Sequence, residues 1–346
     1  MSDTLRAGII GAGFIGTVHA HAVRAAGSTV QRVVASTPQR TAAAASRLGA
    51  QTGADSVREL IEADDVDVVH VCTPNSLHLD LASRAIEAGK PVICEKPLAV
   101  RLADAGLLAD RAAAAGVVAS VPFVYRFYPG VRAIRSRVAA GEGGPLHLMH
   151  GSYLQDWQVA GAPAGWRGEH GEGGEFRAFA DIGVHWCDLV EFVSGQRIAQ
   201  LSARTTGSGA QTTMQFTTDR GVSGSVVVSQ VAAGHKNGLI LALDGFDASY
   251  RFDQENPETV RISNAAETRV LHRGSPGLSP RQSILPPGHP QGYQDCFNAF
   301  VADTYAAIGG DTPDGLPTFA DGLRAARLTD AVVTSSQSST WVEVPS

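Results

Sequence analysis

The sequence has few cysteines, no clustered basic residues and no long apolar run, and each absence excludes a class of protein. Its four cysteines lie far apart and none belongs to a Cys-x-x-Cys pair, so neither a zinc site nor a disulfide framework is predicted. No run of lysine or arginine occurs and the formal net charge is −6, which argues against nucleic acid or an anionic membrane as the main partner. No apolar run is long enough to span a bilayer, and no basic segment of the signal-peptide type opens the chain. We therefore expect a cytoplasmic protein.

The 346 residues, of which 44% are hydrophobic and 18% charged, are sufficient for two globular domains. From Leu5 to about Ser120, short β-branched runs alternate with alanine-rich helical stretches, as in βαβ units on a parallel sheet. From Ile198 onward, short alternating runs separated by turn residues indicate a mainly antiparallel sheet. The pattern predicts an α/β domain over residues 1–122 and an α+β domain with a large open sheet over residues 123–346.

A glycine-rich turn follows the first predicted strand, Ala7 to Ile10. Residues 11–16, GAGFIG, match the G-x-G-x-x-G pattern and precede a helical stretch from Thr17 to Ala26. In this pattern the first glycine permits a tight turn, the second lets a pyrophosphate approach the backbone, and the third allows close helix–strand packing. The helix N-terminus supplies free N–H groups to the phosphates. We therefore predict a dinucleotide site that uses Gly11, Gly13, Phe14, Ile15 and Gly16.

The second predicted strand, Val30 to Ala35, is not followed by the acidic residue that binds an adenosine ribose 2′-hydroxyl in many such domains. Ser36 occupies that position, and Ser36, Thr37 and Arg40 are suited to accept a 2′-phosphate. These residues favour NADP slightly over NAD. They equally suit the N-cap and first turn of the next helix, in which case NAD is the cofactor.

Two further predicted strands end in polar residues. Asp67 to Cys72 leads into Thr73-Pro74-Asn75 and His78, which either contact the cofactor ribose or form an ordinary turn and helix cap. Pro91 to Cys94 leads into Glu95-Lys96-Pro97. Because ligands bind beyond the carboxyl ends of parallel strands, we expect Glu95 and Lys96 near the reactive ring of the cofactor; the alternative is a surface turn with an ion pair.

In the second half, Asp181 and His185 are four residues apart, so on a helix they share a face with Asp188. An aspartate in this position orients an imidazole that acts as a general base. The alternatives are an N-cap aspartate and a core histidine. A metal site formed with Cys187 ranks third, because Cys187 points off that face.

A long segment rich in glycine and tryptophan precedes this helix, from Gln155 to Arg177, and its tryptophans argue for function rather than disorder. Hydroxyl-rich ligands need paired donors and acceptors beside aromatic rings. Two of the residues that meet this need, Tyr125 and Tyr153, fit equally well in a core or an interface. The candidate substrate contacts are Tyr125, Arg126, Tyr153, Gln155, Asp156 and Trp157.

Together these motifs resemble the glucose–fructose oxidoreductase / inositol dehydrogenase / rhizopine-catabolism (Gfo/Idh/MocA) family. The resemblance covers nearly the whole chain and rests on residues 11–16, Thr73-Pro74-Asn75-x-x-His78, Glu95-Lys96-Pro97-Leu98, Trp166-Arg167 and Asp181-x-x-x-His185. It implies an N-terminal Rossmann domain and a C-terminal domain whose open sheet forms a homodimer or homotetramer. It also implies metal-free, NAD(P)-dependent oxidation of a secondary alcohol on a sugar or cyclitol.

The resemblance further implies roles for individual residues. Lys96 corresponds to the catalytic lysine, Asp181 and His185 to the catalytic pair, and Trp166-Arg167 to a stretch near the nicotinamide; a cis peptide bond precedes Pro97. We expect His185 to take the hydroxyl proton while Lys96 stabilises the developing alkoxide, with the substrate held between the domains. Two alternatives are an NAD-dependent glycosidase on the same fold, which oxidises a sugar carbon transiently, and a cofactor-sensing regulatory protein without catalysis.

Overall fold

The computed structural model describes residues 4–159, 177–278 and 285–345. The chain folds into two compact units, which we describe separately. The first, unit 1, contains the residues up to Val124 together with Tyr293–Ala326. The second, unit 2, contains Tyr125–Gly292 together with the residues from Arg327 onward. No helix among the described residues is long and apolar enough to cross a membrane.

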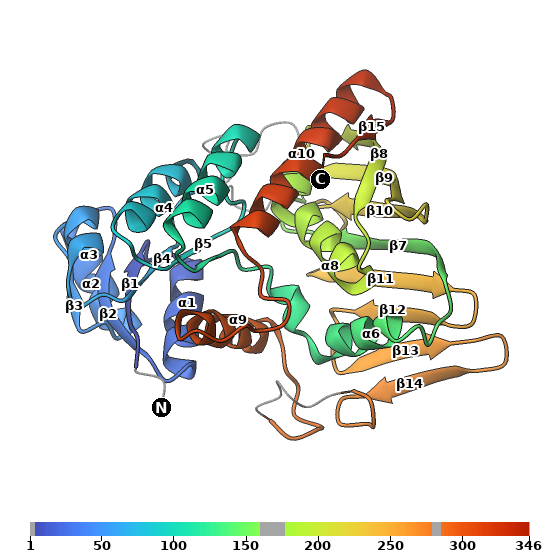
Figure 1. The fold of residues 1–346 in the computed structure, drawn as a ribbon, viewed down its shortest axis with the longest axis horizontal. Coiled ribbons are helices and arrows are strands. Elements are labelled where there is room, and N and C mark those ends of the chain that lie inside the picture. Colours follow the sequence, from blue (N-terminus) through green and yellow to red (C-terminus); the bar gives the residue numbers. More distant parts are fainter. Residues whose placement is uncertain (1–3, 160–176, 279–284, 346) are drawn as a thin grey trace. The chain divides into compact units, whose positions relative to one another are not determined.

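Unit 1 is built on a six-stranded, fully parallel sheet in the order β3-β2-β1-β4-β5-β6 (Figure 1). Its central strand β4 consists of three valines and His70, all of them buried, which is the burial pattern of a strand covered on both faces. The strands are β1 Arg6–Ile10, β2 Thr29–Val34, β3 Thr52–Gly53, β4 Val68–Val71, β5 Val92–Cys94 and β6 Ala119–Ser120. The helices are α1 Phe14–Ala25, α2 Pro38–Leu48, α3 Val57–Glu62, α4 His78–Glu87, α5 Leu102–Ala115 and α9 Tyr293–Ile308, with a short 3-10 turn η1 at Asn75–Leu77. This confirms the predicted parallel α/β fold.

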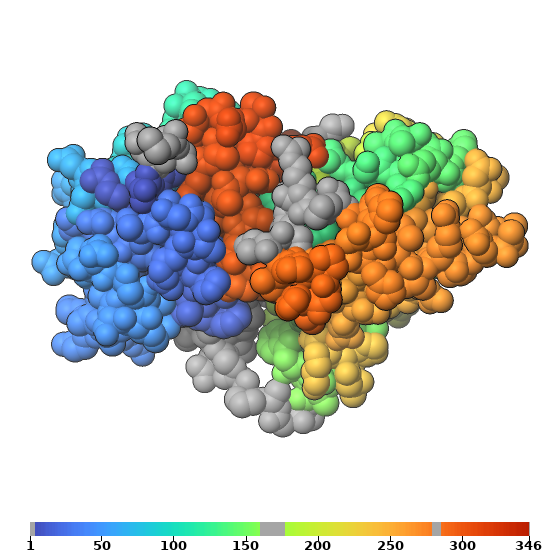
Figure 2. Space-filling view, turned by 90° about the horizontal axis from the view of Figure 1, so that it is seen from below, coloured from blue at the N-terminus to red at the C-terminus, as the bar shows by residue number. Residues whose placement is uncertain are grey.

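Neither unit is one continuous stretch of the chain. Helix α9 and the first part of α10, Phe319–Ser338, group with unit 1, although they follow all but one strand of the other sheet. The reason is apolar packing: α9 lies against α1, and its Phe297 and Phe300 are fully buried. The blue N-terminal part and the orange-red C-terminal part of this unit therefore lie side by side (Figure 2).

Unit 2 contains a nine-stranded sheet in the order β14-β13-β12-β11-β7-β10-β9-β8-β15. All pairings are antiparallel except that of β7 with β10, which confirms the predicted, mainly antiparallel sheet. The strands are β7 Leu146–Leu154, β8 Ile198–Thr206, β9 Gln211–Thr218, β10 Ser223–Ser229, β11 Gly238–Gly245, β12 Ser249–Asp253, β13 Thr259–Ser263, β14 Thr268–His272 and β15 Val342–Glu343. Helices α6 Pro129–Ala139 and α8 Val184–Ser194 contact strands β7 and β11 to β13, and a 3-10 turn η2 spans Val124–Phe127.

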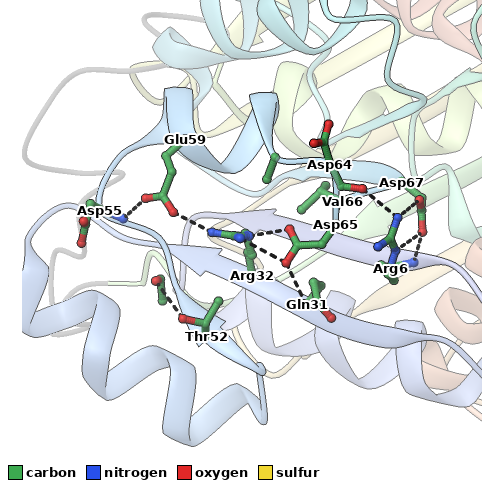
Figure 3. Close-up of polar contacts among 12 residues, drawn as sticks. Arg6, Gln31, Arg32, Thr52, Asp55, Glu59, Asp64, Asp65, Val66 and Asp67 are labelled. Carbon is green, nitrogen blue, oxygen red and sulfur yellow. Dashed lines mark hydrogen bonds and ion pairs between the residues drawn. The ribbon is translucent and has the colours of Figure 1, made fainter.

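Ion pairs join the strands of unit 1 to the loop before β4 (Figure 3). Arg6 on β1 binds Asp67, with Nη2 2.9 Å from Oδ1, and Arg32 on β2 binds both Asp65 and Glu59. The hydrogen bond from Arg6 holds the pKa of Asp67 below its ordinary value of 3.8, and Arg32 does the same for Asp65. The ionised carboxylates therefore fasten two strands of the sheet to one loop.

These depressed pKa values predict the acid sensitivity of the fold. Because each aspartate has a lower pKa folded than unfolded, its stabilisation is complete above about pH 4 and is lost as the pH falls through the folded-state pKa. We expect Asp67→Asn to lower the melting temperature at neutral pH and to flatten its dependence on pH below about pH 4. Thermal melts across this range test it, with exposed Asp110→Asn on α5 as control. If the melting temperature of Asp67→Asn falls with decreasing pH as steeply as that of the wild type, the prediction is wrong.

Candidate active site

Four strands of unit 1 end together at one edge of the sheet. Ile10 pairs with Val34 and Val71, and Val71 pairs with Cys94, so the last residues of β1, β2, β4 and β5 are in register. The segments that follow them are the four polar or glycine-rich stretches singled out in the sequence. The carboxyl edge of a parallel sheet is where ligands of such folds bind.

The glycine-rich loop has the shape that a pyrophosphate requires. Gly11 has a φ of +100°, and a Cβ atom there would lie 2.4 Å from the carbonyl oxygen of Cys72. A Cβ on Gly16 would lie 2.3 Å from the carbonyl oxygen of Gly11, so helix and loop approach closely only with glycine. Beside Gly13 the space is open. Gly13 is also the N-cap of α1 and no described side chain caps that helix, which leaves its first N–H groups available to an anion.

An arginine that the sequence did not single out lies on this loop. Arg47, near the end of α2, donates from Nη1 to Thr17 Oγ1 at 2.8 Å and from Nη2 to the carbonyl oxygen of Ala12. Its side chain is exposed. Arg47 therefore brings a positive charge to the glycine-rich loop. It follows Ala12 by 35 residues in the sequence, and residue spacing does not predict a contact over such a separation.

The residues after β2 form a helix cap. The Thr37 hydroxyl accepts a hydrogen bond from the backbone N–H of Arg40, and Pro38 occupies the first turn of α2. Arg40 Nη1 also lies 3.1 Å from Ser36 Oγ, and all three of these side chains are exposed. The capping alternative is therefore present in the fold, and the contact of Ser36, Thr37 and Arg40 with a 2′-phosphate stays a prediction.

The segment after β4 contains one buried polar atom without a partner among the described residues, Thr73 Oγ1. Such an atom is expected where a ligand supplies the missing hydrogen bond. His78, by contrast, is fully buried, with Nδ1 2.8 Å from the Pro97 carbonyl oxygen and Nε2 3.0 Å from that of Thr73. Burial lowers the pKa of His78, so the ring is neutral and its single N–H donates to one of these two carbonyl oxygens at a time. Its direct contact with a cofactor, like those of Pro74 and Asn75, stays a prediction.

In the segment after β5, Glu95 is buried and Lys96 is partly exposed. The Glu95 side chain is buried and its Oε2 accepts a hydrogen bond from the Lys96 backbone N–H at 3.2 Å, whereas Lys96 is half-buried. The Lys96–Pro97 peptide bond is cis, as the family resemblance implied. Burial, aided by the charge of Glu95, raises the pKa of the Cys72 and Cys94 thiols, which are therefore uncharged neighbours.

In unit 2, the aromatic candidates form a connected polar group. The hydroxyls of Tyr125 and Tyr153 hydrogen-bond to each other, and that of Tyr153 also donates to Asn237 Oδ1 at 2.8 Å. Gln155 donates to the same oxygen at 2.7 Å and accepts from Trp157 Nε1 at 2.9 Å. Asn237, which joins these side chains, was not identified from the sequence because it lies in an ordinary polar turn 82 residues after Gln155. Asp156 stands apart from this group, and its hydrogen bond from Lys236 lowers the pKa of its carboxyl group.

His185 lies beside this group at the start of α8, with its ring 5.1 Å from that of Tyr125. The turn before α8, Phe179–Gly183, is a π-helix, a form with more residues per turn that is frequent at functional sites. Asp181 lies in this turn and accepts a hydrogen bond from Gln230 Nε2 at 2.8 Å. The wider turn alters the i,i+4 geometry assumed from the sequence, and the contact between Asp181 and His185 stays a prediction. No three His, Cys, Asp or Glu side chains in the described ranges are placed to hold a metal ion.

Arg126 and Asp188 form a buried ion pair. Arg126 Nε lies 2.8 Å from Asp188 Oδ2, a second bond joins Nη2 to Oδ1, and both side chains are less than a tenth exposed. The structure thus gives Arg126 a partner inside the protein. The remaining predicted site residues, Trp166 and Arg167, lie outside the described residues.

Breaking this pair is expected to destabilise unit 2. Asp188→Asn removes the carboxylate charge that pairs with the buried Arg126 guanidinium, which costs about 3–5 kcal/mol. Urea unfolding followed by circular dichroism measures the loss. Asp80→Asn, which breaks an exposed pair with Arg84, is the matched control and is expected to cost less than about 1 kcal/mol. Equal losses in the two variants contradict the prediction.

Comparison with known proteins assigns the chain to a family. A family model described as "Oxidoreductase family, NAD-binding Rossmann fold" matches residues 5–123, and one described as "GFO/IDH/MocA C-terminal domain" matches residues 131–251. Among curated relatives, levoglucosan dehydrogenase of Pseudarthrobacter phenanthrenivorans is 29% identical over 99% of both chains. Inositol 2-dehydrogenase of Rhizobium meliloti is 29% identical over 96% of this chain and 97% of its own.

Solved structures agree over the full length. The crystal structure of an oxidoreductase domain protein from Kribbella flavida is 32% identical, covers all of both chains and superposes with a TM-score of 0.90. A levoglucosan dehydrogenase in complex with NADH and levoglucosan is 27% identical over 99% of this chain and 100% of its own, with a TM-score of 0.91. With both of its domains matched, the chain belongs to the Gfo/Idh/MocA family of NAD-binding oxidoreductases.

Proposed function

We propose that the protein oxidises a secondary hydroxyl of a sugar, sugar derivative or cyclitol to a ketone, or catalyses the reverse reaction, with a nicotinamide cofactor. The enzyme class, a sugar or polyol dehydrogenase, follows from the family and its named members. The observation that best supports the proposal is the common edge at which β1, β4 and β5 end. That edge carries the open Gly13 backbone, the buried Thr73 hydroxyl and the segment of Lys96.

In the proposed mechanism, two groups of opposite function act on the substrate hydroxyl. Lys96 donates a hydrogen bond from its ammonium group to the reacting oxygen and stabilises the charge that develops there. His185 takes the hydroxyl proton, and Asp181 orients His185 or binds a neighbouring hydroxyl. When bound, the cofactor supplies a nicotinamide ring that accepts the hydride from the same carbon. The CH–OH group thus loses one hydride and one proton and becomes a carbonyl.

The choice of nicotinamide cofactor depends on the residues after β2. The family's NAD-binding fold and the NADH complex of a levoglucosan dehydrogenase support NAD. The exposed guanidinium of Arg40 beside Ser36, without a carboxylate at that position, supports acceptance of the 2′-phosphate of NADP. The ratio of kcat/KM for the two cofactors decides between them.

One experiment tests the proposed function as a whole. Purified protein is incubated with NAD or NADP and a panel of free sugars, anhydrosugars such as levoglucosan, inositols and glycosides, and cofactor reduction is followed by absorbance. We expect reduction with at least one free polyol or anhydrosugar. Release of sugar from a glycoside without net cofactor reduction identifies the glycosidase instead, and inactivity across the panel with retained cofactor binding identifies the regulatory protein.

We also propose that unit 2 forms a homodimer or homotetramer through its sheet. The supporting observation is a shallow hollow across β8, β9 and β10, which Ser336 and Ser339 also line. Its exposed or half-buried strand side chains include Ser202, Arg204, Thr213, Gln215, Ser225 and Val227. Of these six side chains only Arg204 is charged, which suits contact with a second copy. Light scattering after gel filtration gives the mass, and a monomer contradicts the proposal.

A further inference from the structure

Four side chains of unit 1 are connected by consecutive hydrogen bonds that begin at Glu95, the residue before Lys96. Glu95 Oε1 lies 3.1 Å from His19 Nε2, His19 Nδ1 lies 2.8 Å from His70 Nδ1, and His70 Nε2 lies 2.8 Å from the hydroxyl of Tyr305. These hydrogen bonds connect the end of β5 to α1, α1 to β4, and β4 to α9. None of these contacts was predicted from the sequence, and the proposed mechanism does not use His19, His70 or Tyr305.

All four side chains are shielded from water. His19 and His70 are 0% exposed, and Glu95 and Tyr305 are each 7% exposed. Burial, together with neighbouring His19, holds the pKa of His70 well below its usual range, and burial raises the pKa of Tyr305. His70 is therefore a neutral imidazole and Tyr305 keeps its proton. A buried hydrogen-bond network of this kind is stable only if every donor faces an acceptor.

This requirement leaves two arrangements of protons. A neutral imidazole has one N–H, so only one of the two facing Nδ1 atoms carries a proton. When Glu95 is ionised and His19 is neutral, His19 donates from Nε2 to Glu95, His70 donates from Nδ1 to His19, and Tyr305 donates to His70 Nε2. When the Glu95–His19 pair gains a proton, His19 donates from Nδ1 to His70. His70 must then carry its proton on Nε2 and donate it to the Tyr305 oxygen, whose own hydrogen points away from the His70 ring.

We propose that Glu95, His19, His70 and Tyr305 act as one hydrogen-bond relay, in which the charge of the Glu95–His19 pair and the tautomer of His70 change together and set the charge beside Lys96. His19, His70 and Tyr305 are then positioning residues, since none of them touches the reacting atoms. The relay itself follows from the geometry of unit 1; only its effect on Lys96 rests on the proposed function.

Among the described groups around Glu95, Lys96 is the cation expected to respond to the charge of the Glu95–His19 pair. Cys72 on the β4 side and Cys94 on β5 are uncharged thiols with raised pKa values, and His78 on α4 is a buried ring with a lowered pKa. The Lys96 backbone N–H donates to Glu95 Oε2, so the carboxylate lies one residue from the lysine side chain. An ionised Glu95 places a negative charge beside Lys96, and a proton on the Glu95–His19 pair removes that charge.

The relay is tested by ¹⁵N NMR of the imidazole nitrogens, which distinguishes protonated from unprotonated ring atoms. In the wild type we expect only the two matched pairs: His19 Nε2–H with His70 Nδ1–H at higher pH, and His19 carrying Nδ1–H with His70 Nε2–H at lower pH. His70 never becomes an imidazolium. A His70 tautomer that stays the same until acid unfolding overturns the proposal.

Glu95→Gln removes the carboxylate that takes part in the transition. In this variant we expect the His70 tautomer change to disappear or move to lower pH, because a buried His19 imidazolium then lacks a counter-charge. A transition at the wild-type pH overturns the relay, because His70 then titrates independently of Glu95.

Tyr305→Phe tests the far end of the relay. Without the hydroxyl, the low-pH arrangement leaves a buried His70 N–H without an acceptor, which costs more than the bare nitrogen left in the other arrangement. We expect the tautomer transition to move about 0.7 pH unit lower, equivalent to the loss of one ordinary hydrogen bond. Tyr250→Phe, which alters a buried tyrosine of unit 2, is the matched control and is expected to leave the transition unchanged. An unchanged transition in Tyr305→Phe removes Tyr305 from the relay and overturns the proposal.

Activity then tests the link to Lys96. We expect the acid limb of the kcat–pH profile of Tyr305→Phe to move in the same direction as its tautomer transition, with KM changed less than about twofold. A shifted transition with an unshifted profile overturns the effect on Lys96. The proposed function fails differently: if Lys96 is not catalytic, its alanine variant stays active while the tautomer transition remains.

Discussion

Lys96→Ala is expected to lower kcat by about 100- to 1,000-fold, because it removes the donor that stabilises the developing alkoxide. Binding of NADH, measured by fluorescence titration, is expected to change less than about twofold, since the lysine acts mainly in the transition state. The loss should therefore appear in kcat rather than in cofactor affinity. Lys96→Arg keeps the charge but not the compact ammonium group, so it is expected to recover little of the activity.

The control for this variant is Arg101→Ala, which removes an exposed cation five residues further along the same segment. The Arg101 side chain is 74% exposed in its salt bridge to Asp104, and near-normal turnover is expected. A Lys96→Ala enzyme with turnover similar to this control removes the lysine from the mechanism. A loss of NADH binding that matches the loss of turnover instead assigns Lys96 to cofactor binding.

His185→Ala is expected to lower kcat by about 100- to 10,000-fold, because the hydroxyl proton then has no side-chain acceptor. His185 is 7% exposed and packs against the ring of Tyr125, so truncation also leaves a space that a small base can enter. Added imidazole is therefore expected to restore part of the turnover. Rescue separates a proton-transfer role from a packing role, which imidazole does not replace.

His150→Gln, on β7, provides a comparison with a partly exposed histidine paired with Asp244. We expect normal turnover and no response to imidazole. If His185→Ala stays active, the proton is taken by another group. If it is inactive, binds NADH and is not rescued, the contribution of His185 is structural, and its proposed role as general base is wrong.

Much of unit 1 was predictable because its signals are local. Strands β1, β4 and β5 are short and mainly apolar, and the residues that follow each strand share an edge because parallel strands end together. The glycines of the first loop were interpretable for the same reason, since each steric requirement arises within a few residues. The sites at Gly11 and Gly16 leave no room for a side chain.

Contacts made across the chain were not predictable from spacing. His70 and Tyr305 are 235 residues apart, and Asn237 reaches Tyr125 over 112 residues. The apolar pattern of α9 indicates a buried face but not that this face packs against α1. The π-helical turn at Phe179–Gly183 likewise has no signature in the residue pattern, because it differs from an α-helix only in its hydrogen-bond register.

The return of α9 to unit 1 has a consequence for how the protein is made. Residues 4–124 leave the ribosome long before Tyr293–Ala326, yet the two segments share one core. Until the late segment is synthesised, the surface of α1 that α9 covers stays open and His70 has no Tyr305. The nucleotide-binding half of the protein therefore finishes folding near the end of translation, after most of the second sheet has emerged. Contacts between segments this far apart in the sequence favour slow maturation of unit 1.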